Sequence, residues 1–235
     1  MPKAASLSHY NLTNNARAIM LLANSITPNF DETSTILNIL PLYHVFSFVG
    51  GSLVGAVLGV PNIYPAPGFN AALSIKAVAA RKPTHMIGTP TMFTDIVNDP
   101  TLMDHDMSSL SYAIVGGAPV TPALVRTAAE KLDLRMCVGY GMTENTCATF
   151  LTPIGAEEHV TCNTVGFPIG GLDAKIIDTD EKTLQVGEIG ELCTRGFTIF
   201  QGYVADEEKT RQSFTQDGFF KTGDLAMVNE DGTVR

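Results

Sequence analysis

Cysteine and positive charge are both scarce in this sequence. The 235 residues include four cysteines, and no two of them are spaced as C-x-x-C. A chain of this length can fold on a hydrophobic core without disulfides, so a reduced, intracellular setting is favoured. The 15 Lys and Arg residues against 24 Asp and Glu residues give a net charge of −9. This balance argues against a broad nucleic-acid-binding surface, and we expect no nucleic-acid partner.

Charged residues are missing altogether from residues 33–75, which raises the question of a membrane span. The apolar run Val45–Val60 contains a G-x-x-x-G pattern, but it is 16 residues long and ends at Pro61. A span needs about 20 apolar residues, and no basic cluster flanks this run. The N-terminus also lacks the apolar region of a secretory signal. We therefore expect no transmembrane span, and instead a tightly packed helix at Val45–Leu58 in a globular protein.

The first 150 residues alternate short apolar segments with segments of helical periodicity. Hydrophobic residues make up 45% of the chain and charged ones 17%, which suits a protein that buries a core. The predicted strands are Thr35–Leu40, Asn62–Tyr64, Thr84–Ile87, Tyr112–Val115 and Met136–Val138. The predicted helices are Leu12–Asn24, Asn70–Arg81, Thr91–Asn98 and Thr121–Leu132. This alternation predicts that residues 1–150 form an α/β subdomain with a mostly parallel sheet flanked by helices.

The pattern changes at about Phe150, where helical periodicity nearly disappears. Short segments between turn residues are predicted strands: Asp173–Ile177, Glu191–Thr194 and Leu225–Val228. One helix is predicted at Asp206–Phe214, with Asp206 as its cap. Residues 151–235 are therefore predicted to form a small antiparallel, β-rich, barrel-like subdomain packed against the first. Near the end, Asp231-Gly232 predicts a hairpin turn whose second strand we expect to be missing.

Two glycine-containing segments are candidate ligand-binding sites. One follows the end of a predicted strand, where open α/β sheets bind ligands, and the other sits in a turn. Gly116-Gly117-Ala118-Pro119 follows one predicted strand and can expose backbone groups to a flat ring, although for this segment alone a plain strand-to-helix turn is the favoured explanation. Lys221-Thr222-Gly223-Asp224 lies in a predicted turn. The Asp224 carboxylate there can accept hydrogen bonds from a ribose diol, or it can close an Asx turn.

A third segment, Gly139-Tyr140-Gly141-Met142-Thr143-Glu144, follows the next predicted strand. The Thr143 hydroxyl can bond a phosphate oxygen, Glu144 can hold Mg²⁺ through oxygen, and Tyr140 offers a ring face to a base. The alternative is a turn with a solvated glutamate. A fourth candidate is His44, between a strand and the apolar helix, where a core histidine with satisfied hydrogen bonds is the ordinary explanation.

Taken in chain order, these segments resemble the serial motifs of adenylate-forming enzymes. Further segments that carry the resemblance are Pro2-Lys3, Leu7-Ser8-His9-Tyr10-Asn11 and Gly190-Glu191-Leu192-Cys193-Thr194-Arg195-Gly196. The chain is similar to AMP-forming acyl-CoA synthetases of the superfamily that includes firefly luciferase, and within it to medium-chain fatty acyl-CoA synthetases. The resemblance implies a partial N-terminal domain of that superfamily. It also implies a reaction in which ATP activates a carboxylic acid as acyl-adenylate, after which coenzyme A displaces AMP.

The resemblance further implies roles for individual residues. Thr143 would bind the α-phosphate, Glu144 the Mg²⁺ ion and Asp224 the ribose hydroxyls of ATP or AMP, while His44 would stand near the reacting carboxylate. The adenine would be framed by Gly117, Ala118 and Tyr140, with Gly141 and Met142 along the acyl pocket. The remaining cofactor-binding residues would be Lys3, Gly116, Pro119 and Gly139.

Departures from the family pattern lead us to expect negligible activity from this chain alone. Ala4 stands where the family has Gly, and the family's Ser/Thr/Gly-rich phosphate loop would precede Met1. The mobile C-terminal domain with its lysine, and an Arg that contacts ribose, would follow Arg235. Losing these groups should weaken transition-state stabilisation more than nucleotide binding. We expect the central fragment of an acid–CoA ligase, cytoplasmic or mitochondrial, with its targeting region outside this chain.

Two other interpretations stay open. A non-catalytic protein could keep the fold and bind a nucleotide or a partner. An oxidoreductase ranks lower, because no G-x-G-x-x-G opens a first βαβ unit.

Overall fold

The computed structural model describes residues 3–26 and 30–235, and its largest element is a seven-stranded sheet in the order β3-β2-β4-β5-β6-β7-β8. Its strands are β2 (Ile36–Asn38), β3 (Asn62–Ile63), β4 (His85–Gly88), β5 (Tyr112–Gly116), β6 (Arg135–Tyr140), β7 (Phe150–Leu151) and β8 (Phe167–Pro168). The first five strands in this order run parallel. Strand β7 then pairs antiparallel with β6, and β8 pairs antiparallel with β7. The prediction of a mostly parallel sheet is confirmed.

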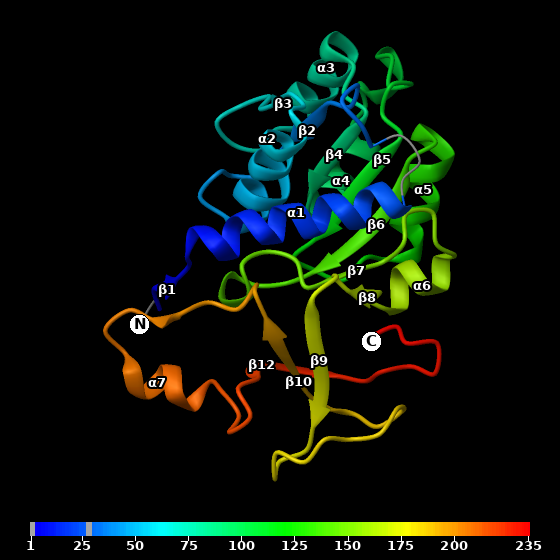
Figure 1. Ribbon diagram of the computed structural model, residues 1–235. Coiled ribbons are helices and arrows are strands. Elements are labelled where there is room, and N and C mark those ends of the chain that lie inside the picture. Colours follow the sequence, from blue (N-terminus) through cyan, green and yellow to red (C-terminus); the bar gives the residue numbers. More distant parts are fainter. Residues whose placement is uncertain (1–2, 27–29) are drawn as a thin grey trace.

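Helices cover both faces of this sheet (Figure 1). One face packs against α3 (Ala71–Arg81), α4 (Pro90–Val97) and α5 (Pro122–Leu132), and the other against α1 (His9–Ile26) and α2 (Val54–Leu58). Neighbouring side chains of one strand pack on opposite faces of the sheet. Ile36 belongs to the core under α1, and Leu37 belongs to the core under α3 and α4. The strands are apolar throughout because both of their faces are buried.

Side-chain caps fix where the helices begin. The amide of Leu73 donates to Asn70 Oδ1 at 2.8 Å, and Thr89 and Thr121 cap α4 and α5 in the same way. Each threonine is followed by a proline, whose missing N–H costs nothing in the first turn. The predicted helices in this part are confirmed, with boundaries that move by a few residues at most.

The apolar segment predicted as one regular helix has two parts. Residues Phe46–Leu53 (η1) form a wider π-helix, and α2 continues from it. A Cβ on Gly51 would clash with Asn38 Nδ2, so only glycine leaves room for the Asn38 side chain at this position. Asn38 Nδ2 donates to Ser47 O at 3.0 Å. Close packing is therefore confirmed, but against a side chain of β2. In the described ranges, no helix combines the length and the apolar character that crossing a bilayer requires.

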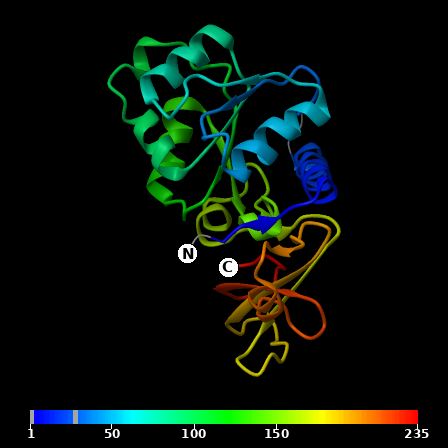
Figure 2. The same ribbon diagram turned by 90° about the vertical axis from the view of Figure 1, so that its left-hand side faces the viewer.

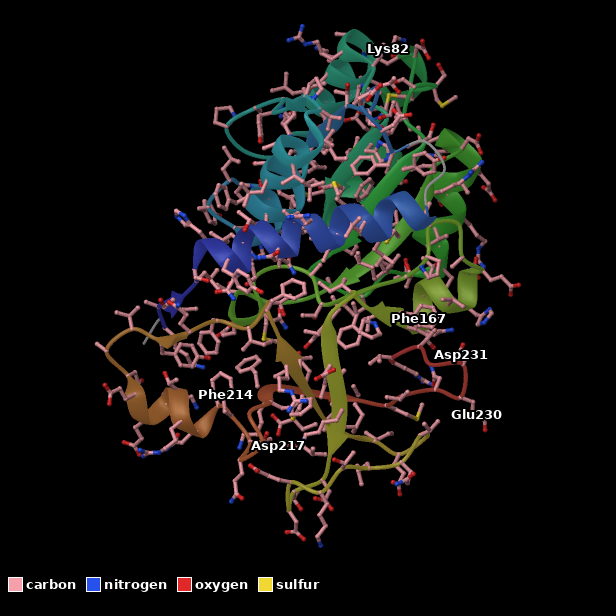
Figure 3. The ribbon with its side chains drawn as sticks, viewed as in Figure 1. Lys82, Phe167, Phe214, Asp217, Glu230 and Asp231 are labelled. Carbon is pink, nitrogen blue, oxygen red and sulfur yellow. The ribbon has the colours of Figure 1, made fainter. Side chains whose placement is uncertain are left out.

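The second part of the chain contains a three-stranded antiparallel sheet in the order β12-β10-β9. In Figure 2 this part, coloured yellow to red, lies below the large sheet and its helices. Its strands are β9 (Leu172–Ile177), β10 (Gly190–Gly196) and β12 (Phe220–Ala226). A two-stranded pair joins β1 (Ala5–Ser6) to β11 (Gly202–Tyr203). Helix α7 (Glu207–Gln212) has the predicted cap, since Lys209 N donates to Asp206 Oδ1 at 2.9 Å, but it ends before Phe214 (Figure 3).

Two features after residue 150 differ from expectation. Strands β7 and β8 extend the large sheet, and the helix α6 (Glu158–Asn163) was not predicted because six residues are too few to show a helical period. The expectation that the last hairpin lacks its second strand is wrong. Met227 and Arg235 exchange two backbone hydrogen bonds of 2.9 Å, with Glu230 and Asp231 at the tip (Figure 3).

Candidate functional site

Asp224 is presented by a bulge within strand β12, and not by a turn as predicted. In the register of β12 on β10, Glu191 pairs with Leu225 and Cys193 pairs with Lys221, so Thr222, Gly223 and Asp224 together face Leu192. Gly223 has a φ of +81°, a left-handed conformation that glycine adopts readily. Thr222 Oγ1 donates to Leu192 O at 2.8 Å, which ties the bulge to the neighbouring strand. The sequence could not reveal the bulge, because the long-range register creates it.

The bulge meets the end of β6 through one side-chain hydrogen bond. Tyr140 Oη donates to Asp224 Oδ2 at 2.6 Å. Burial raises the pKa of the Tyr140 hydroxyl well above its ordinary value, and the hydrogen bond to the Asp224 carboxylate raises it further. The phenol is therefore neutral at physiological pH and donates its proton to an exposed carboxylate.

A cavity of about 530 Å³ lies between the two parts of the chain at this contact. Among the residues predicted for the site, its lining includes Gly117, Ala118, Pro119, Gly139, Tyr140, Gly141 and Asp224. Residues 117–119 lie just beyond β5, residues 139–141 lie at the end of β6, and Asp224 lies in the bulge of β12. Three segments that are far apart in sequence thus converge at the carboxyl end of the parallel sheet, where open α/β sheets bind ligands.

A second, smaller cavity of about 50 Å³ shares Gly117, Gly139, Tyr140 and Gly141 with the first. It continues toward the π-helix, and most of its other lining is apolar. His44, Gly116 and Met142, three more of the predicted site residues, line it as well. His44 Nδ1 accepts a hydrogen bond from Phe46 N at 3.1 Å, so the proton of the neutral ring lies on Nε2. His44 is exposed, which excludes the core-histidine interpretation.

The structure places Thr143, Glu144 and Lys3 outside the lining of these two cavities. Thr143 is exposed and Glu144 is half-buried in the short 3₁₀ turn Thr143–Asn145 (η3) that follows β6. Tyr203 Oη donates to Glu144 Oε1 at 2.8 Å, and Lys3 Nζ lies 5.0 Å from the centroid of the Tyr203 ring. Burial raises the pKa of Tyr203 to about 12, with the hydrogen bond to Glu144 as a further cause. Pro2, which precedes Lys3, lies outside the described residues.

Several lining residues of the larger cavity were missed by sequence reasoning. They include the end of α6 and the residues after it, Thr161–Val165, together with Val234 and Arg235 of the last hairpin. Backbone hydrogen bonds of 2.8 Å from Val165 to Val234 and from Val234 to Gly166 hold these segments together. No short motif marks them, because they reach the cavity only through tertiary pairing. Acidic Glu157 and Glu158, at the cap and in the first turn of the short helix, were the available signal.

A parallel sheet whose strand ends surround an open cavity, with a small β-sheet closing one side, defines an α/β nucleotide-binding fold. The chain belongs to the family of AMP-binding enzymes, whose model matches residues 1–204. Together with the relatives described next, this match confirms the resemblance to AMP-forming acyl-CoA synthetases, including the medium-chain ones.

The individual relatives agree with this family. The chain is 35% identical to medium-chain acyl-CoA ligase ACSF2, mitochondrial, of Bos taurus over 98% of its own length. It is 28% identical to the long-chain-fatty-acid-CoA ligase FadD1 of Archaeoglobus fulgidus, with a TM-score of 0.86 over 100% of the chain. It is also 28% identical to ATP-bound MatB of Rhodopseudomonas palustris, with a TM-score of 0.85 over 99%. The chain spans 38% of the bovine protein and 48% and 44% of the two crystallised chains.

Proposed function

We propose that the protein to which this chain belongs is an ATP-dependent acid–CoA ligase, and that this chain supplies its adenylate and acyl sites. The observation that carries the proposal is the convergence of residues 117–119, residues 139–141 and Asp224 on one cavity. An adenylate needs a slot for its base, an acceptor for its ribose hydroxyls and donors for its phosphate. The three segments offer these groups side by side.

The nucleotide would lie across the larger cavity. Gly117 and Ala118 leave room for the adenine beside the Tyr140 ring, and Gly116, Pro119 and Gly139 shape the same slot. The free oxygen of the Asp224 carboxylate would accept the ribose hydroxyls while Tyr140 holds the other oxygen. The phosphates would point toward the turn after β6, where the exposed Thr143 hydroxyl can donate to the α-phosphate. Lys3, whose Nζ lies 5.0 Å from the centroid of the Tyr203 ring, would donate to the same phosphates.

The Glu144 carboxylate fits a Mg²⁺ ion whose other ligands would be the phosphates of ATP and water. Within residues 3–26 and 30–235, no cluster of three or more acidic, His or Cys side chains could form an all-protein metal site. Mg²⁺ usually takes one or two carboxylates together with substrate phosphates and waters, so Glu144 alone can serve. When bound, the ion would offset the negative charge that builds up on the phosphates during transfer.

The carboxyl end of the acid would enter the smaller cavity, with the carboxylate toward His44. The Nε2–H group of His44 can donate to that carboxylate and hold it in line with the α-phosphorus, which is the main task of the protein in this reaction. Gly141 and Met142 would line the path of the acyl chain. Attack of the carboxylate on the α-phosphorus would give the acyl-adenylate and release pyrophosphate. The thiol of coenzyme A would then attack the acyl carbon and release AMP.

The substrate class and the location rest on the relatives. The bovine relative is named a medium-chain acyl-CoA ligase and mitochondrial, which supports a medium-chain fatty acid and a mitochondrial location for this protein. A cytoplasmic location is the alternative, and fractionation of cells that express the tagged protein distinguishes the two.

Binding of an acyl-adenylate mimic tests the proposal on this chain. We expect an acyl-sulfamoyl adenosine to bind more tightly than AMP, because each methylene that enters the apolar cavity contributes about 0.8 kcal/mol, or about fourfold in affinity. Equal affinities for AMP and for the mimic would favour the alternative of a non-catalytic nucleotide-binding protein. Absence of binding by both compounds would contradict the nucleotide site itself.

A further inference from the structure

The segment that ends at Tyr203 holds Glu144 at two points. Phe200 N donates to the backbone carbonyl of Glu144 at 2.8 Å, and Tyr203 Oη donates to its side-chain Oε1 at 2.8 Å. The two side chains lie 59 residues apart in sequence. Both the position and the orientation of the Glu144 carboxylate are therefore set by one distant segment.

Tyr203 itself is held firmly in place. Its side chain is 8% exposed, and its ring makes an edge contact with Phe200 at a centroid distance of 4.9 Å. Its backbone amide donates to Thr210 Oγ1 at 2.8 Å, and Val204 N donates to Ala4 O at 2.8 Å in the pairing of β11 with β1. A donor fixed by ring packing and by backbone pairing can hold a carboxylate in one orientation.

The Glu144 carboxylate keeps capacity for a further partner. It is half-buried, and within the described part of the chain Tyr203 is the side chain that hydrogen-bonds it. Oε2 is thus open to solvent or to a cation. A fixed donor on one oxygen is what orients a metal-binding carboxylate.

We propose that Tyr203 is a positioning residue for Mg²⁺·ATP: it holds the Glu144 carboxylate through Oε1 and leaves Oε2 available to bind the ion. This role rests on the proposed function, in which Glu144 binds the ion beside the phosphates. Tyr203 touches neither the ion nor the nucleotide. Removing its hydroxyl therefore weakens the contribution of the metal to ATP binding and leaves metal-free binding unchanged.

The test compares ATP affinity in Mg²⁺ with ATP affinity in EDTA, by calorimetric titration of the 235-residue chain and its variants. In Tyr203→Phe the ring packing stays and only the hydroxyl is lost. We expect the Mg²⁺-dependent gain in affinity to fall about tenfold or more, with the EDTA affinity unchanged. Tyr64→Phe is the matched control, because it also removes a hydroxyl with a side-chain partner, Ser52 Oγ at 2.7 Å, and should keep the full gain.

A second variant separates positioning from general stability. Glu144→Gln should abolish the Mg²⁺-dependent gain, and adding Tyr203→Phe to it should weaken binding no further, because the two residues act as one unit. A Tyr203→Phe chain that keeps the full gain overturns the proposal. Equal losses in Mg²⁺ and in EDTA, or failure of Tyr203→Phe to fold, show a structural role and also overturn it.

Failure of the proposed function looks different in the same experiment. A wild-type chain that binds no ATP in either buffer contradicts the nucleotide site and removes the role of Tyr203 with it. A wild-type chain that binds ATP without any gain from Mg²⁺ contradicts only the metal-binding role of Glu144 and the positioning by Tyr203.

Discussion

Tyr140 and Asp224 join the two parts of the chain through a hydrogen bond of 2.6 Å between residues 84 positions apart. The bond links the end of a parallel strand to a bulge in the antiparallel sheet, and the larger cavity lies beside it. Because Tyr140 bonds Oδ2, it fixes the orientation of Asp224 while the other oxygen stays available. This contact thus both contributes to the interface and orients the proposed ribose acceptor.

Asp224→Ala should weaken AMP binding about tenfold or more, because a charge-assisted hydrogen bond contributes about 1.5–3 kcal/mol. The same change should remove any preference for AMP over 2′-deoxy-AMP, since the group that distinguishes the ribose hydroxyls is gone. Calorimetric titration measures both affinities. Asp180→Asn, at an exposed loop, is the control and should bind like wild type. An unchanged preference for AMP in Asp224→Ala would remove Asp224 from the site.

Gly223→Ala should destabilise the fold by roughly 1–2 kcal/mol, the cost of a left-handed conformation for an L-residue with a Cβ. No atom lies within 4 Å of a Cβ built there, so backbone strain and not a clash causes the loss. Relaxation of the bulge should also move Asp224 and weaken AMP binding. Urea unfolding provides the measurement. Gly170→Ala, which has similar open space and no left-handed φ, should change stability by less than about 0.5 kcal/mol. Equal effects of the two changes would contradict the importance of the bulge.

Cys162 should be the one thiol that a water-soluble disulfide reagent labels in the native protein. It lines the larger cavity and is half-buried, whereas Cys137, Cys147 and Cys193 are buried, and burial raises the pKa of each of these three thiols to about 12. Burial also raises the pKa of Cys162, so the reaction should be slow. AMP should slow it further by filling the cavity. Absorbance at pH 8 follows the reaction, with Cys162→Ser as a control that should not react. Protection that fails at saturating AMP would place the nucleotide elsewhere.

His85 should make the protein less stable below about pH 6.5. Its ring contacts those of Phe30 and Tyr112 at centroid distances of 4.4 and 5.0 Å, and its buried Nε2 has no hydrogen-bond partner among the residues that the structure describes. Burial lowers the pKa of His85 to about 4 from 6.5, although Asp31 acts in the opposite direction. Between these two values the unfolded chain binds the proton and the folded chain does not. Stability is therefore complete above pH 6.5 and falls toward pH 4, by about 3 kcal/mol.

The slope of unfolding free energy against pH checks this prediction between pH 4 and pH 7. His85→Phe should flatten the slope in that window. Val78→Ala, a buried change without an ionisable group, should lower stability by a similar amount at every pH. A slope that His85→Phe leaves intact would assign the acid sensitivity to other groups.

Local patterns predicted the elements of the α/β part because they depend on neighbours in sequence. The Asn70, Thr89 and Thr121 caps, with the prolines after the threonines, mark helix starts, and apolar runs mark strands that are buried on both faces. The glycine segments after β5 and β6 were found for the same reason.

The features that sequence reasoning missed, such as the β12 bulge, depend on contacts between residues far apart in the sequence. The bulge at Asp224 follows from the register of β12 on β10, and the pairing of Val234 with Gly166 brings the last hairpin to the cavity. The contact of Tyr203 with Glu144 links two short motifs that give no sign of each other in the sequence. Such long-range contacts become visible only once the chain is folded.

The position of bound AMP tests the central claim most directly. A crystal structure of this chain with AMP should show the adenine between residues 117–119 and Tyr140, and the ribose hydroxyls on Asp224. AMP bound at another surface, or with its ribose facing away from Asp224, would contradict the account.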